Sequence, residues 1–107
     1  MLVGGVGQGH LTLAMRDGAD GRVLAAVTLD CGPDGGTHPD PAGACRRLAA
    51  AGGQIARIQG RREICSMIYL PVTVTVRGEW GGRKVAYTHT YGNRCVARTA
   101  AGGLFRF

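Results

Sequence analysis

The length, composition and charge of the chain exclude several classes of protein. With 107 residues, 45% of them hydrophobic, the chain fits a single domain, residues 1–107, with enough apolar side chains for a core. The net charge of +6 comes mainly from arginines that are scattered along the sequence, and aromatic residues are few, so nucleic-acid binding is not expected. No apolar run reaches the roughly 18 residues of a transmembrane helix, so no membrane partner is expected.

Two alternating segments near the start of the chain predict a β-hairpin. Residues 1–9 are rich in glycine and are expected to be frayed. Apolar and polar residues alternate over 10–16 and again over 22–30, which is typical of strands with one buried face. Residues 17–21 between them are aspartate, glycine and alanine, so we expect a turn of five residues there.

The middle of the chain predicts a loop and then a helix. Residues 32–41 contain several glycines, prolines and aspartates and are expected to be loop. Residues 44–58 place apolar side chains at helical spacing, and the glycine pair at 52–53 is expected to interrupt this helix.

The last part of the chain returns to strand patterns. Val72, Val74 and Val76 alternate with polar residues and give the strongest strand signal, over 71–77. A turn at 78–82 and a returning strand at 83–91 follow, and the alternating tail at 104–107 is expected to be a closing strand. These elements predict an α+β fold, an antiparallel sheet with one or two helices packed on one face.

The four cysteines predict two disulfides. Cys31, Cys45, Cys65 and Cys95 have no close C-x-x-C spacing, so a zinc site or a redox dithiol is not expected. Of the three possible pairings we favour the sequential one, whose loops would contribute about 3 and about 4 kcal/mol in the loop-entropy model. Disulfides indicate an oxidising compartment, so a secreted protein is expected, although residues 1–5 do not resemble a signal peptide.

The chemistry-bearing residues do not form an enzyme motif. No nucleophile elbow or zinc-protease motif occurs, and the histidines stand in separate sequence contexts: His10, His38 and His89. His38, Asp34 and Asp40 are potential metal donors, but their placement in a turn-rich loop is better explained as ordinary loop decoration. The glycines of residues 4–9 follow no strand and so fail as a phosphate loop. We therefore expect no enzyme, cofactor or metal.

The segment from Ile64 to Pro71 is the most informative part of the chain. It places the half-cystine Cys65 two residues before an apolar Met67–Ile68 bond. One hypothesis is an exposed, extended strip that a disulfide holds in place like a protease substrate. The other is a buried strand, because a lone methionine in an apolar segment is usually a core residue.

A set of short motifs in order along the chain distinguishes these hypotheses. From about residue 11 to residue 107 the sequence resembles the Streptomyces subtilisin inhibitor family of secreted serine-protease inhibitors. The motifs are Ala26-Val27-Thr28-Leu29-x-Cys31, Gly36-Thr37-His38-Pro39, Ala44-Cys45 with Leu48-Ala49, Cys65-x-Met67-x-Tyr69-x-Pro71-Val72, Gly78-x-Trp80-x-Gly82, Tyr87, Asn93-x-Cys95 and Phe105-x-Phe107.

The resemblance implies both a fold and a mode of action. The fold would be a five-stranded antiparallel sheet with two helices, the disulfides Cys31–Cys45 and Cys65–Cys95, and a homodimer. The partners would be subtilisin-like and possibly chymotrypsin-like serine proteases, bound like substrates at the reactive bond Met67–Ile68. The loop residues in contact with the protease would be Ile64, Cys65, Ser66 and Tyr69, together with Met67 as the primary specificity residue and Ile68.

Two positions carry further expectations. Residue 66 is commonly proline in this family, and Ser66 leaves φ free, which predicts a looser loop and weaker or more temporary inhibition. Asn93 lies two residues from Cys95, and we expect its amide to support the loop backbone; the simpler interpretation is a turn residue after Gly92.

A non-inhibitory extracellular binding module on the same scaffold is the alternative function. Trp80 and Phe107 are expected in the core or packed against the sheet.

Overall fold

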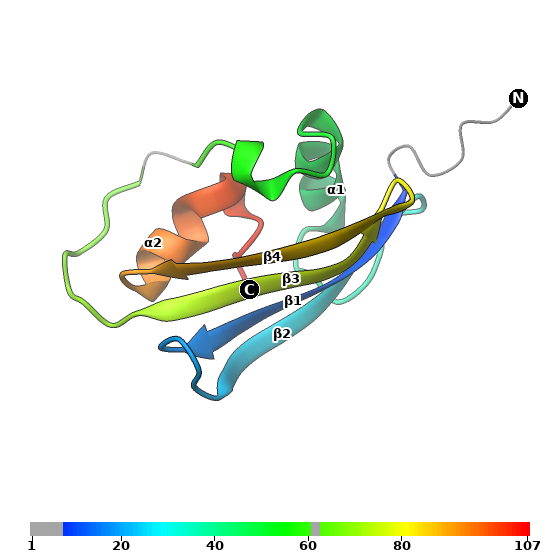
Figure 1. Cartoon of the computed structure of the whole chain (residues 1–107). Coiled ribbons are helices and arrows are strands. Elements are labelled where there is room, and N and C mark those ends of the chain that lie inside the picture. Colours follow the sequence, from blue (N-terminus) through cyan, green and yellow to red (C-terminus); the bar gives the residue numbers. More distant parts are fainter. Residues whose placement is uncertain (1–7, 61–62) are drawn as a thin grey trace, which may run out of the picture.

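The computed structural model describes residues 8–60 and 63–107 and shows an antiparallel sheet with both helices on one face (Figure 1). Its strands are β1 (Gly9–Asp17), β2 (Val23–Cys31), β3 (Val72–Trp80) and β4 (Arg83–Tyr91), in the spatial order β2-β1-β3-β4. Its helices are α1 (Pro41–Ala50) and α2 (Arg94–Thr99), followed respectively by the 3-10 helices η1 (Ile55–Arg57) and η2 (Ala100–Gly103). Residues 1–7, where fraying was expected, lie outside the described ranges, and Gly9 already belongs to β1.

The expected α+β class is confirmed, but the expectation of five strands is wrong for the described residues, whose sheet has four. The tail at 104–107 is not a closing strand because the chain reverses just before it. Ala101, Gly102 and Gly103 have φ values of 49°, 63° and 93°, in the left-handed region. The reversal turns Leu104 and Phe105 into the core, where they are 1% and 0% exposed.

The two hairpins lie close to where alternation predicted them. β1 and β2 extend one residue beyond the expected bounds at most of their ends. β3 continues to Trp80, through part of the expected turn, because Trp80 is a core residue that is only 6% exposed. The turn is therefore reduced to Gly81 and Gly82, whose positive φ values suit a two-residue hairpin turn.

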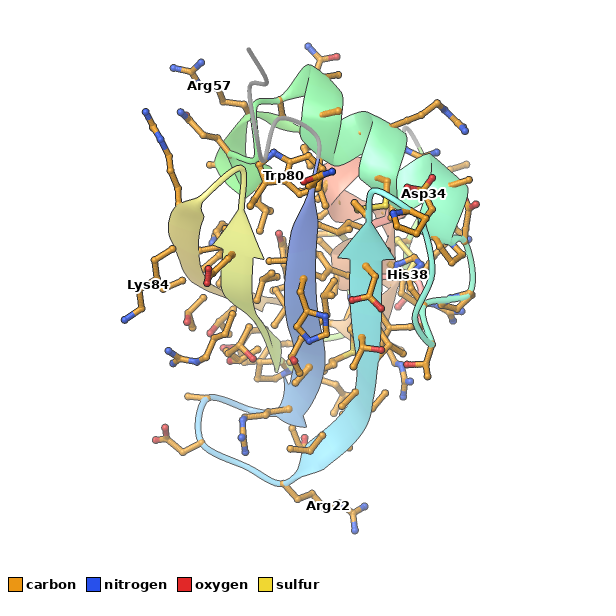
Figure 2. The ribbon with its side chains drawn as sticks, turned by 90° about the vertical axis from the view of Figure 1, so that its right-hand side faces the viewer. Arg22, Asp34, His38, Arg57, Trp80 and Lys84 are labelled. Carbon is orange, nitrogen blue, oxygen red and sulfur yellow. A yellow bond between two sulfur atoms is a disulfide. The ribbon has the colours of Figure 1, made fainter. Side chains whose placement is uncertain are left out.

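Helix α1 begins and ends at residues with clear local causes. It starts three residues earlier than predicted because the Asp40 carboxylate caps it, accepting a hydrogen bond from the Gly43 N–H at 3.1 Å, and Pro41 suits the first helical position. It ends before the glycine pair, as expected. A Cβ on Gly53 would lie 2.4 Å from Trp80 Cδ1, so no larger residue fits there. Figure 2 shows Trp80 below α1, at this end of the sheet.

The core lies between the inner face of the sheet and the helices. Phe107 is partly buried against it. The largest fully buried side chains come from every layer: Leu11, Leu13, Met15, Leu29, Leu48, Val74, Val76, Leu104 and Phe105. Within the two described ranges, no helix combines the length and the apolar content needed to cross a bilayer.

Candidate functional site

The segment from Glu63 to Pro71 forms a long loop without helix or strand between η1 and β3, at one end of the sheet (Figure 1). Its apolar side chains are directed to solvent, with Met67 96% exposed. The core methionine Met15, by contrast, is 0% exposed. Met67 is therefore not a core residue, and the buried-strand hypothesis is wrong. Loops that display large apolar side chains commonly bind another molecule.

A disulfide connects this loop to helix α2. Cys65 is bonded to Cys95, the second residue of α2, and Cys31 is bonded to Cys45, which gives the sequential pairing that we favoured. The exposed Met67 thus lies only two residues from a covalent link to the body of the protein. The cross-link limits how far the exposed segment can move from the helix.

Asn93 holds the loop with one end of its side chain and helix α2 with the other. Its Oδ1 accepts a hydrogen bond from the Val96 N–H at 2.9 Å, which caps the helix. Its Nδ2 donates to the carbonyl oxygens of Ser66, at 3.0 Å, and of Ile68, at 2.8 Å. These carbonyls lie on either side of Met67, so a single amide spans the exposed segment.

Ser66 makes a contact that the sequence analysis missed. Its Oγ accepts a hydrogen bond from the Ile68 N–H, 3.1 Å away. Serine and threonine often accept from the backbone two residues ahead, and this habit is the signal that could have predicted the bond. The expectation that Ser66 loosens the loop stays a prediction.

Further contacts fix both ends of the loop, and none was predicted. At the start, Arg106 from the C-terminal tail pairs with the Glu63 carboxylate. At the end, the Leu70 N–H donates to the Gly92 carbonyl at 2.9 Å, and the Gly18 N–H donates to the Pro71 carbonyl at 2.8 Å. Between these ends Ile64 and Tyr69 stay exposed, at 101% and 75%.

The residues considered for a metal site have other partners. His38 is 5% exposed, and its Nε2–H donates to the Leu104 carbonyl at 2.8 Å while its Nδ1 accepts from the Asp40 N–H at 3.0 Å. Both ring nitrogens are therefore occupied. Among the described residues, the one group of three potential metal donors that comes together is Cys31, Asp34 and Cys45, and its two sulfurs are already joined to each other.

Some basic residues line one hollow at the start of the loop, namely Arg94, Arg98 and Arg106, while others lie apart from one another. Figure 2 shows Arg22, Arg57 and Lys84 at separate places on the surface. These three residues are therefore separated in space as well as along the sequence.

The family comparison decides the relationship of the chain. The model of the subtilisin inhibitor-like family matches residues 8–93. The chain belongs to this family. The matched residues include the exposed Met67 and Ile68 and the half-cystine Cys65, whose partner Cys95 lies two residues beyond the match.

Individual family members extend the comparison. Subtilisin inhibitor-like protein 5 from Streptomyces fradiae is 45% identical over 86 residues, which cover 78% of this chain and 80% of that protein. Trypsin inhibitor STI2 from Streptomyces longisporus is 48% identical over 86 residues, covering 78% of this chain and 60% of that protein.

A solved structure supports the fold directly. Sermetstatin from Streptomyces caespitosus, in a crystal structure with Bacillus licheniformis subtilisin, superposes with a TM-score of 0.78 at 33% identity. The superposition covers 92% of this chain and 98% of sermetstatin. The named members of the subtilisin inhibitor-like family are inhibitors of proteases rather than enzymes.

Proposed function

We propose that the chain inhibits subtilisin-like serine proteases, and chymotrypsin-like ones as well, by binding them like a substrate at Met67–Ile68. The observation that carries this proposal is the 96% exposure of Met67 on a loop that a disulfide and Asn93 hold in place. The crystal structure of sermetstatin with subtilisin supports the choice of partner.

The loop offers both a side chain and a backbone to the protease. Ile64, Cys65 and Ser66 would pair with the cleft on the acyl side of the bond, and Ile68 and Tyr69 on the leaving side. Burial of the Met67 side chain contributes about 1.5–3 kcal/mol, whereas nanomolar binding requires about 12 kcal/mol. Backbone pairing, the neighbouring side chains and the prior ordering of the loop must therefore supply most of the affinity.

The contacts on the two sides of Met67 also explain why such a bound loop would not be released as product. Cys65 holds the acyl side through Cys95, and Asn93 holds the carbonyl of Ile68 on the leaving side. After cleavage both new ends would stay attached to the same helix. Because reacting groups held together have a high effective concentration, the bond can form again.

The uncovered face of the sheet supports a homodimer, which we include in the proposal. Arg77 stands in the middle of this face, in register with Thr12 on one side and Ala86 on the other. The positions in register around it carry small side chains: Thr12, Ala14, Ala26, Thr28, Thr75, Ala86 and Thr88. Two such faces can pack against each other around the arginine, and sedimentation equilibrium at micromolar concentration would measure the dimer.

Secretion is the remaining part of the proposal. The two disulfides suit an oxidising environment outside the cell, where extracellular proteases act. Detection of the oxidised protein in the culture medium of its source would test this location.

A titration of subtilisin tests the main proposal. Increasing amounts of the chain are added to a fixed amount of active-site-titrated enzyme, and the residual activity is followed. We expect a stoichiometric endpoint, with the chain recovered mostly intact. Rapid digestion of the loop, or no effect on activity, would instead support a non-inhibitory binding module, which the inhibitor names of the relatives disfavour.

A further inference from the structure

We propose that the hydroxyl of Ser66 positions the leaving nitrogen of the Met67–Ile68 bond, an inference that rests on the proposed inhibition. The Oγ of Ser66 accepts a hydrogen bond from the Ile68 N–H at 3.1 Å. The nitrogen of Ile68 is the atom that leaves the Met67 carbonyl carbon when a protease cuts this bond. The hydroxyl therefore contacts one of the two reacting atoms of the inhibitor itself.

This hydrogen bond closes a small ring across the reactive bond. The ring starts at the Ser66 side chain, follows the backbone through Met67 and returns from the Ile68 nitrogen. Asn93 connects the same two residues a second time, through their carbonyl oxygens at 3.0 and 2.8 Å. The nitrogen side of Ile68 is thus held by Ser66 and its carbonyl side by Asn93.

The contact matters most when the bond is broken. In acylation the serine oxygen of the protease bonds to the Met67 carbonyl carbon, the bond to the Ile68 nitrogen breaks, and that nitrogen takes the proton that the catalytic base removed from the serine. The new amine still has an N–H to donate to Ser66 Oγ, while its lone pair stays near the acyl carbon. In the reverse step the lone pair attacks this carbon, the ester bond breaks, and the amine proton returns through the base to the serine oxygen.

Ser66 and proline would therefore support the loop in different ways. A proline at position 66 would restrict φ but would carry no hydroxyl. Serine leaves φ free and instead makes a bond to an atom that takes part in the reaction. Ser66 is exposed in the free chain, and a bound protease would exclude water from the contact and strengthen it.

The test compares Ser66→Ala, which removes only the hydroxyl, with Ser66→Thr, which keeps it. A catalytic amount of subtilisin is incubated with intact chain and, separately, with chain cleaved at Met67–Ile68. Mass spectrometry follows both reactions until they reach the same ratio of cleaved to intact chain. We expect Ser66→Ala to slow resynthesis and to raise the cleaved-to-intact ratio by about 2- to 10-fold, the effect of one neutral hydrogen bond. Ser66→Thr should stay within about twofold of the unchanged chain in both measurements.

Three results would overturn the inference. If Ser66→Ala resynthesises the bond as fast and to the same ratio as the unchanged chain, the hydroxyl has no positioning role. If Ser66→Thr loses as much as Ser66→Ala, the effect does not come from the hydroxyl. If the unchanged chain fails to inhibit subtilisin, the proposed function falls and this inference falls with it, so the subtilisin titration distinguishes the two failures.

Discussion

The Nδ2 of Asn93 lies 2.8 Å from the carbonyl oxygen of Ile68, and the same amide caps helix α2 through its Oδ1. The side chain therefore connects the first turn of a helix to the leaving side of the proposed reactive bond. The two functions use different atoms of one amide, so different substitutions can separate them.

Replacing Asn93 by aspartate should weaken inhibition without loss of the helix cap. Aspartate caps helices about as well as asparagine, but its second oxygen would face the carbonyls of Ser66 and Ile68 and could donate nothing to them. We expect the inhibition constant for subtilisin to rise at least tenfold and the loop to be cut faster. Asn93→Ala should also raise the constant and should additionally lower stability by about 1 kcal/mol, measured by urea unfolding. Unchanged inhibition in both variants would mean that Asn93 serves only as the cap of helix α2.

Replacing Met67 by lysine should move inhibition towards trypsin. The side chain is 96% exposed and contributes nothing to the core, so the substitution should leave the melting temperature unchanged. The carboxylate at the bottom of the trypsin pocket would then pair with the lysine, whereas the apolar pocket of subtilisin would bind the lysine less well. Inhibition constants against both proteases measure the shift, and the absence of any shift would remove Met67 from the specificity position.

The two disulfides should have different effects when each is removed in turn. Cys65→Ser with Cys95→Ser should convert the loop into an ordinary substrate, because the acyl side is no longer covalently held after cleavage. Cys31→Ser with Cys45→Ser is the matched control, since it removes a bridge far along the chain from the loop. In the loop-entropy model, loss of the first disulfide lowers the free energy of unfolding by about 4 kcal/mol and loss of the second by about 3 kcal/mol. Both variants are therefore assayed well below their melting temperatures. Equal loss of inhibition in the two variants would contradict a local role for Cys65–Cys95.

Replacing His38 by alanine should destabilise the fold by about 2–4 kcal/mol. The imidazole is 5% exposed and joins the Asp40 N–H to the Leu104 carbonyl, and its removal would leave both groups without these bonds and create a cavity. Urea unfolding measures the change. His10→Ala is a suitable control because His10 pairs with Asp30 at an exposed site, and such pairs contribute about 0–1 kcal/mol. Similar losses for both variants would argue against the buried bridge.

Tyr91 should ionise only at strongly alkaline pH. Burial, together with the hydrogen bond and charge interaction with Tyr87, raises the pKa of Tyr91 well above its usual value near 10. Because the folded state holds this proton more tightly than the unfolded state, its contribution to stability is complete below about pH 10 and is lost as the pH rises further. In a titration that follows the absorbance of ionised tyrosine, Tyr91→Phe should remove the part of the absorbance increase that occurs at the highest pH. An unchanged end of the titration curve would contradict the shift.

Much of the fold could be predicted from alternation alone. Alternating segments such as the valines of β3 predicted the hairpins, and the glycine pair after α1 predicted the end of that helix. Both signals are local in the sequence. The tail failed because its alternation resembles a strand, whereas the left-handed residues from Ala101 to Gly103 turn it into the core. The short helix α2 showed no sequence period: the patterns along the chain predicted one or two helices, and the family resemblance implied two.

The candidate site, like the fold, has features that the sequence predicted and features that it did not. The exposed strip around Met67 and its link through Cys65 followed from the sequence and the family resemblance, and the Asn93 amide lies where it was expected to reach the loop. The Ser66 hydroxyl bond and the pairing of Glu63 with Arg106 did not follow, since each depends on a side-chain direction or on a partner distant in sequence.

Asn93 binds the loop only through backbone carbonyl oxygens, which every amino acid possesses. The side chains of Met67 and Ile68 take no part in these hydrogen bonds and are directed to solvent. The residues that would select a protease can therefore be exchanged while the shape of the loop stays the same. In the proposed mode of binding, the side chains of Met67 and Ile68 are separate from the amide that holds the loop backbone, so one scaffold can serve inhibitors of quite different specificity.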